Sequence, residues 1–240
     1  MQLRKIILAT LLILCPVLCF AQYSDKAMYQ AYLQQDMPFW NRYLHDTNWS
    51  TLTQKEKARY LNYEYGYVAT AIDTKQDDAK QHVAWFLEHI NAMKSVLPAS
   101  TILMYRSSYA AYRAKLSSWE YAKQGLRAFN LAKDAVKADE NDPYALTLLG
   151  CVDFYAPSLF GGSKSRALQL FQKAERIFVE RGDTINNWNY ASVCMQMAMC
   201  LDKTGHSDEA IRLCEQLLQR DPNFLFIRDK YLPQLRKKKK

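Results

Sequence analysis

Glycine and proline are scarce in this chain. Its 240 residues include seven glycines and seven prolines, and the apolar residues fall into long runs without the regular turn signals that separate short strands. This scarcity argues against a sandwich or barrel built from many short strands. Because 49% of the residues are apolar, the chain has enough material for a sizeable core. We therefore expect an all-α fold.

Residue patterns typical of metal-binding and catalytic sites are also missing. Among the four histidines, only His82 and His89, seven residues apart, could share a helix face, and no acidic or cysteine ligand stands at the usual spacing beside them. The sequence has no C-x-x-C and no G-x-S-x-G, and its GGSKS segment lacks the two glycines that a phosphate loop requires. We expect no metal, no cofactor and no enzymatic activity.

The net charge of +8 is concentrated at the two ends of the chain. Two positive charges are Arg4 and Lys5, and five more lie in residues 236–240, so the rest of the chain is near +1. No basic face is therefore required, and a specific nucleic-acid partner is not expected. The basic tail, 236–240, is expected to be a solvated, disordered end. A weak tether to anionic lipid or polymer is the alternative.

The first 21 residues have the layout of a secretory signal peptide. Arg4 and Lys5 precede an apolar stretch that ends at Leu14, and small residues lead to Ala21. The alternative is a membrane anchor, but the apolar run is shorter than the roughly 20 residues that span a bilayer, and no later segment is long enough. We expect cleavage after Ala21 and a protein exported to the periplasm or outside the cell.

The C-terminal part of the chain contains a repeat-like pattern. From Ala191 it reads ASVCMQMAMCLDKTGHSDEAIRLCEQLLQRDP. Small residues allow two antiparallel helices to approach closely, a glycine suits the turn, and a proline stops the second helix. The residues concerned are Ala198, Gly205, Ala210 and Pro222. This segment resembles a tetratricopeptide repeat, and Ser207 is expected to cap its second helix.

A second repeat-like unit starts at Asp142 and carries an insertion, YAPSLFGGSKS. This insertion is similar to the Phe-Gly-Gly loop of some exported bacterial tetratricopeptide proteins, including the repeat subunit of tripartite periplasmic transporters. Gly161 and Gly162 are expected to form a flexible turn, with Ser163 or Ser165 capping the next helix. The resemblance implies antiparallel helix pairs stacked as a solenoid that becomes degenerate toward the N-terminus.

The resemblance weakens upstream, although the helical period continues. Residues 60–72, with Gly66 at a plausible helix crossing, lead into an amphipathic stretch at 77–93. We therefore divide the chain into the signal peptide (1–21), N-terminal capping helices (22–52), the tetratricopeptide-like domain (53–235) and the basic tail (236–240). The capping helices are expected because the first repeat of a solenoid must shield its open side.

Two cysteines of the last repeat are expected to face each other. Cys194 lies four residues before Ala198, and Cys214 lies four residues after Ala210. One interpretation is a pair of small buried thiols in a helix interface. The alternative, favoured by export, is a disulfide between Cys194 and Cys214.

The arrangement of aromatic residues is the sequence evidence that favours a binding function. In a tetratricopeptide array, the first helix of each pair lines the concave surface. Projecting that register predicts one stripe of residues, which is either a peptide-binding groove or part of the core. The stripe comprises Tyr60, Tyr63, Tyr67, Tyr105, Tyr112, Tyr144, Phe154, Met195 and Met199.

Two functions follow from the resemblance and from the stripe. The first is a non-catalytic scaffold of the cell envelope that binds a protein or peptide along its concave face. The alternative is a carrier of a small ligand or a transporter-associated repeat protein. An open groove would favour the scaffold, whereas a deep pocket lined by aromatic residues would favour the carrier.

Overall fold

The computed structural model describes residues 22–238, apart from the side chain of Phe160. This part of the chain is all-helical, with no strand among the described residues, which confirms the all-α prediction. The predicted signal peptide and the last two residues of the basic tail lie outside it. None of the described helices is long and apolar enough to cross a membrane.

The helices pack mainly in consecutive pairs. Four pairs follow one another: α4 (Gln54–Asp73) with α5 (Ala79–Ala92), α6 (Ala99–Leu116) with α7 (Tyr121–Ala138), α8 (Pro143–Tyr155) with α9 (Lys164–Glu180), and α10 (Trp188–Lys203) with α11 (Ser207–Arg220). The first helix of each pair also contacts the first helix of the next. These first helices therefore form a continuous inner layer.

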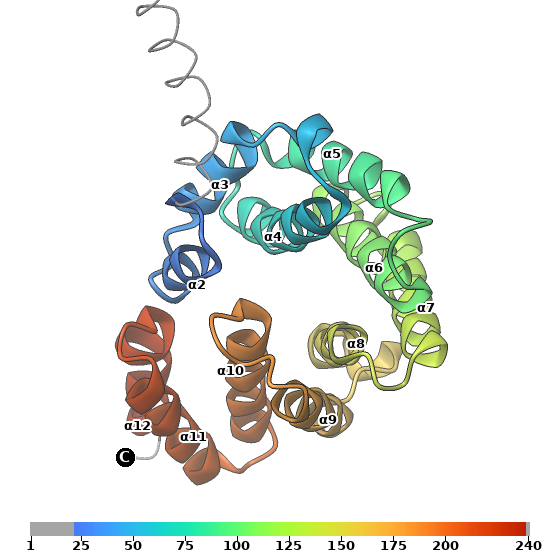
Figure 1. Cartoon of the computed structure of the whole chain (residues 1–240). Coiled ribbons are helices and arrows are strands. Elements are labelled where there is room, and N and C mark those ends of the chain that lie inside the picture. Colours follow the sequence, from blue (N-terminus) through green and yellow to red (C-terminus); the bar gives the residue numbers. More distant parts are fainter. Residues whose placement is uncertain (1–21, 239–240) are drawn as a thin grey trace, which may run out of the picture.

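The two ends of the described chain meet. Figure 1 shows the pairs following a curve that brings α2 (Asp25–Leu33) and α3 (Met37–Asp46) round toward α10, α11 and the terminal α12 (Leu232–Lys238). Direct contacts between α2 and α10 accompany this approach. The segment expected to form capping helices, 22–52, thus holds α2, α3 and the short η1 (Trp49–Thr51), and it touches both the first and the last helix pairs.

Side-chain caps fix where three of the inner helices, α4, α8 and α10, begin. Thr53 and Glu56 form a reciprocal capping box at the start of α4, Asp142 caps α8 just before a proline at the first helical position, and Asn187 caps α10. Such caps satisfy the backbone N–H groups of the first turn, which have no partner within the helix. Of the two serines expected to cap α9, Ser163 and Ser165, the structure shows Ser163 as the cap.

Small residues permit the helix crossings. Ala198 and Ala210 are fully buried, and α10 packs on α11. At Gly66, an added Cβ would lie 2.6 Å from Trp40 Cζ3 and 2.9 Å from Trp188 Cη2. Gly66 therefore marks a close approach, as predicted, because only a residue without a side chain leaves room for both indole rings.

Two local predictions were wrong. Ser207 is the first residue of α11 and does not cap it; His206 occupies the N-cap position, and the Ser207 hydroxyl donates to Asp202 instead. The start of the basic tail is helical rather than disordered, because α12 continues to Lys238, although the side chains of residues 236–238 are exposed as expected. Arg236 pairs with Glu215 and Lys238 pairs with Asp202, each at 2.7 Å, and these ion pairs attach the tail to α10 and α11.

The remaining elements connect the pairs. The insertion before α9 contains the short η2 (Ser158–Phe160) and a turn in which Gly161 has a φ of +88°, a left-handed conformation that suits glycine. After α11, the π-helical segment η3 (Phe226–Tyr231) leads directly into α12. In the assembled fold, several inner helices begin beside one another.

Candidate functional site

A pocket of about 720 Å³ lies where the inner helices begin. Its walls come from the N-terminal turns of α2, α4, α6, α8 and α10 and from the turn that precedes α10. The first helices of successive pairs run in the same direction, so their N-termini gather at one end of the inner layer. The pocket volume is within the range typical of small-molecule binding sites.

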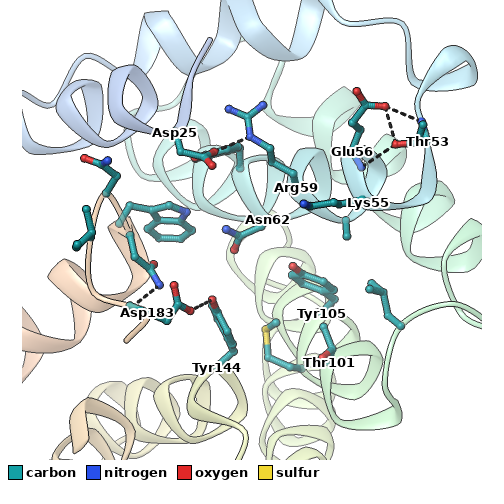
Figure 2. A pocket seen from close by; sticks show the side chains of 18 residues that line it. Asp25, Thr53, Lys55, Glu56, Arg59, Asn62, Thr101, Tyr105, Tyr144 and Asp183 are labelled. Carbon is teal, nitrogen blue, oxygen red and sulfur yellow. Dashed lines mark hydrogen bonds and ion pairs between the residues drawn. The ribbon is translucent and has the colours of Figure 1, made fainter. Parts of the chain in front are cut away.

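One side of the pocket offers hydrogen-bond donors together with the carboxylate of Glu56, which is held by Thr53. Lys55, in the first turn of α4, and Thr101, in the first turn of α6, lie on this side (Figure 2). The residue at the N-cap of α6 is Pro98, and it makes no side-chain cap hydrogen bond. The first N–H groups of α6 therefore lack the side-chain cap found on α4, α8 and α10, and an uncapped helix N-terminus favours negative charge.

The opposite side of the pocket carries two carboxylates, Asp25 and Asp183, and the guanidinium of Arg59. Asp25 accepts hydrogen bonds from Arg59 Nε at 2.6 Å and from the Tyr63 hydroxyl at 3.0 Å. Asp183 accepts from the Tyr144 hydroxyl at 3.1 Å. Both acids are exposed at the surface of the pocket, and Figure 2 shows them on the side away from Lys55 and Thr101.

The tyrosines that hold these carboxylates remain protonated phenols. Burial, followed by the charge of Asp25, raises the pKa of Tyr63, and burial followed by the charge of Asp183 raises the pKa of Tyr144. The neutral phenol is the form that donates a hydrogen bond. The two phenols therefore orient the carboxylates. Because the phenols are neutral, a cation in the pocket would bind to the carboxylates and not to the phenol oxygens.

Asn62 and Tyr105 lie in the middle of the pocket, between the two sides (Figure 2). Asn62 Oδ1 accepts a hydrogen bond from the Asn189 side-chain amide at 3.2 Å, which orients the Asn62 amide group. The ring of Trp188 contributes an apolar wall, and it packs edge to face against Trp40 with centroids 5.2 Å apart. The middle of the pocket thus combines amide, phenol and indole groups.

The predicted stripe divides between the pocket and the core. Tyr63, Tyr105 and Tyr144 line the pocket. Tyr60 and Tyr112 are buried and donate their hydroxyls to backbone oxygens, of Leu44 at 3.0 Å and of Tyr65 at 2.8 Å. Of the rest, Tyr67 and Phe154 are buried, and Met195 and Met199 are partly buried and pack against the core. The stripe as a whole therefore does not form one open groove.

The polar lining of the pocket was missed at the level of sequence. These residues are Asp25, Thr53, Lys55, Glu56, Arg59, Asn62, Thr101, Asp183, Asn186 and Asn187. Most of them look like ordinary polar residues at or just before a helix start, where such residues are common, while Arg59 and Asn62 lie further along α4. The available signal was topological: the first helices of successive pairs begin at the same end, so residues in their first turns lie close together.

Cys194 in α10 and Cys214 in α11 are buried thiols. Cys194 and Cys214 are 4% and 0% exposed, and the structure holds both as free cysteines. Burial raises the pKa of Cys194 to about 11 and that of Cys214 to about 12. The thiols are therefore protonated near neutral pH and behave as small apolar side chains. The disulfide alternative is not formed in this structure.

No model of a known protein family matches this chain, and no curated protein matches it at a significant level.

Proposed function

We propose that this protein is a non-catalytic binding protein whose pocket holds a short zwitterionic ligand, an amino acid or a short peptide. The observation that carries the proposal is the separation of Lys55 and Thr101, on what we call the donor side, from Asp25 and Asp183 on the opposite side, with amide and phenol groups between them. Each side also holds a group of the other charge: Glu56 lies on the donor side, and Arg59 pairs with Asp25. A free peptide has the complementary arrangement, because it bears a carboxylate at one end and an ammonium group at the other.

The carboxylate of the ligand would bind on the donor side. Lys55 is exposed there, and the uncapped start of α6 adds oriented N–H groups beside the hydroxyl of Thr101. A charged amine together with a helix N-terminus is a favourable setting for an anion. The ammonium group would bind to Asp25 and Asp183, and the Asn62 amide would pair with a peptide group between the two ends.

The geometry favours the carrier alternative over the concave-groove scaffold. Most tyrosines of the predicted stripe are buried by the meeting of the inner helices, so little of their surface is free for an extended peptide. The pocket instead presents aromatic and polar groups together in a volume suited to a few residues. Only the end of a longer polypeptide, or a short free peptide, would fit.

The non-catalytic character is part of this proposal. The lining of the pocket contains no histidine, cysteine or serine. Asp25 and Asp183 already accept hydrogen bonds from Arg59, Tyr63 and Tyr144, which fix the orientation of both carboxylates. These features are typical of a site that orients a ligand by charge and hydrogen bonds.

We further propose that the helix pairs form a tetratricopeptide-like solenoid acting in the bacterial cell envelope. The buried alanines at the α10–α11 crossing and the left-handed Gly205 in the turn between these helices support the resemblance. Export is supported by the sequence of residues 1–21 alone. In that setting a binding protein would capture or carry peptide fragments.

Isothermal titration calorimetry with trialanine tests the binding function. We expect saturable binding of one peptide per chain, weakened about tenfold in Lys55→Ala, because one charge-assisted hydrogen bond contributes roughly 1.5 kcal/mol or more. Lys80→Ala is the matched control, since Lys80 is an exposed lysine at the same position in the first turn of α5. Equal affinities of Lys55→Ala and Lys80→Ala for trialanine would contradict the proposal, as would the absence of binding.

A further inference from the structure

A second cluster of polar side chains lies away from the pocket, between α3 and α5. It consists of His45 in the last turn of α3, Asp78 at the N-cap of α5 and His82 in the first turn of α5. One donor atom from each residue lies within 4.8 Å of the other two. The cluster therefore brings two imidazoles and a carboxylate to one point.

The distances approach those of a metal centre. Asp78 Oδ2 lies 3.4 Å from His82 Nε2 and 3.9 Å from His45 Nε2. Ligands about 2.0–2.1 Å from a tetrahedral zinc ion are about 3.3 Å apart. The Asp78–His82 pair already has this spacing, whereas His45 must move closer to both Asp78 and His82, since the three donor atoms lie within 4.8 Å of one another. Its side chain is half exposed, so a small rotation meets little resistance.

The buried ring nitrogens of His82 lack hydrogen-bond partners. The residue is completely buried, and neither of its ring nitrogens makes a hydrogen bond in the structure. Although Asp78 is close enough to His82 for an ion pair, the contact lacks hydrogen-bond geometry. A buried polar atom without a partner costs free energy. A cation placed between the two residues would supply the missing partner of Nε2.

Neighbouring groups hold the carboxylate in place. The Asn41 side-chain amide donates to Asp78 Oδ2 at 3.2 Å, and the Tyr67 hydroxyl lies 3.4 Å from both oxygens of Asp78. The ring of Tyr67 also packs edge to face against His82, with centroids 4.8 Å apart. Hydrogen bonds from such outer groups orient the ligands of metal ions and are part of most metal sites.

We propose that His45, Asp78 and His82 bind one divalent transition-metal ion of the zinc class. Two imidazole nitrogens and one carboxylate oxygen suit Zn²⁺ or Co²⁺, whereas Ca²⁺ and Mg²⁺ prefer oxygen ligands alone. Three protein ligands leave one coordination position, which a water molecule or a partner's side chain would fill. Because the ligands come from α3 and α5, the ion would fasten the N-terminal helices to the first helix pair.

From the sequence alone, His82 and His89 were the two histidines that could share a helix face. In the structure, the histidine that lies beside His82 is His45. His89 Nδ1 lies 2.8 Å from Glu64 Oε2, and the His89 ring stacks on Trp49. His82 instead faces His45, which comes from another helix, and Asp78, which precedes His82 by four residues. A carboxylate four residues before a histidine was the sequence signal for part of this site.

Calorimetric titration with ZnCl₂ tests the proposal on purified protein that carries no affinity tag. We expect one zinc ion per chain and a tetrahedral visible spectrum when Co²⁺ replaces Zn²⁺. His45→Ala should weaken zinc binding at least 100-fold, because even outer-shell partners of metal ligands contribute about 10–100-fold. This variant should fold normally because the His45 side chain is half exposed, and circular dichroism verifies that.

The matched control is His206→Ala, since His206 is an exposed histidine beside a carboxylate, with its Nδ1 3.1 Å from Glu209. We expect this variant to bind zinc as the wild type does. Three results would overturn the proposal: no saturable zinc binding, equal affinities of His45→Ala and wild type, or loss of binding in His206→Ala. His82→Ala is a less direct test because removing a buried ring also disturbs packing.

Discussion

The hydroxyl of Tyr29 donates a hydrogen bond to Asp221 Oδ2 over 2.7 Å, although the two residues are 192 positions apart. Tyr29 belongs to α2, and Asp221 directly follows α11. Tyr32, one turn further along α2, packs its ring against those of Trp188 and Phe224. These contacts join the first described helix to the last pair and so bring Asp25 and Trp188 to the same pocket.

Removing the Tyr29 hydroxyl should weaken this junction. We predict that Tyr29→Phe lowers the free energy of unfolding by about 1–2 kcal/mol, because a partly buried hydrogen bond to a charged acceptor is lost while the ring still packs. Urea unfolding followed by circular dichroism measures the effect. Tyr121→Phe is the control, since the side chain of Tyr121 is exposed. A Tyr29→Phe variant as stable as this control would show that the hydrogen bond does not contribute.

Replacing glycine by alanine should change the free energy of unfolding in opposite directions at two helical positions, Gly66 and Gly125. A Cβ on Gly66 would press on Trp40 and Trp188, whereas a Cβ on Gly125 would meet nothing within 4 Å. We predict that Gly66→Ala costs about 1–3 kcal/mol through overpacking. Gly125→Ala should stabilise by about 0.5–1 kcal/mol, since alanine loses less conformational entropy in a helix. Thermal unfolding of both variants checks the signs, and a stabilised Gly66→Ala variant would refute the close approach of the indoles.

Alkaline pH should unfold the protein through its buried phenols. Burial raises the pKa of Tyr60, Tyr105 and Tyr112 above the ordinary value of about 10. Above that pH the unfolded chain releases these protons while the folded chain retains them. Stability is therefore complete below about pH 10 and falls as the pH rises further.

This alkaline transition is measured by tyrosinate absorbance and helical circular dichroism on the same sample. We predict that most of the absorbance change appears in one cooperative step that coincides with the loss of helix. A gradual rise in tyrosinate absorbance that is complete before any helix is lost would contradict the burial of the stripe.

The sequence was sufficient to predict features set by local spacing. The small residues Ala198 and Ala210 identified a helix crossing, and Ser163 identified a helix start. Ser207 failed as a cap because the Asp202 carboxylate in the preceding helix accepts its hydroxyl. A cap depends on which partner is nearest in space, and residue type alone does not determine that.

The site could not be predicted because its residues come from distant segments. Helical periodicity assigns a tyrosine to the inward face, but it does not say whether another helix covers that face. Trp188 closes on Gly66 and Tyr32 only because the chain curves back on itself. The same curvature gathers Asp25, Lys55 and Asp183, which are too far apart in sequence for any spacing rule to relate them.

The affinity of the pocket for peptides with free and blocked ends tests the proposed function most directly. Trialanine and its N-acetylated, C-amidated form have the same backbone, but only the first bears both charges. The two-sided pocket predicts that trialanine binds to the wild-type protein and that the blocked peptide binds at least about tenfold more weakly, because two charge-assisted contacts are lost. Equal affinities for the two peptides, or no binding of trialanine, would contradict the account.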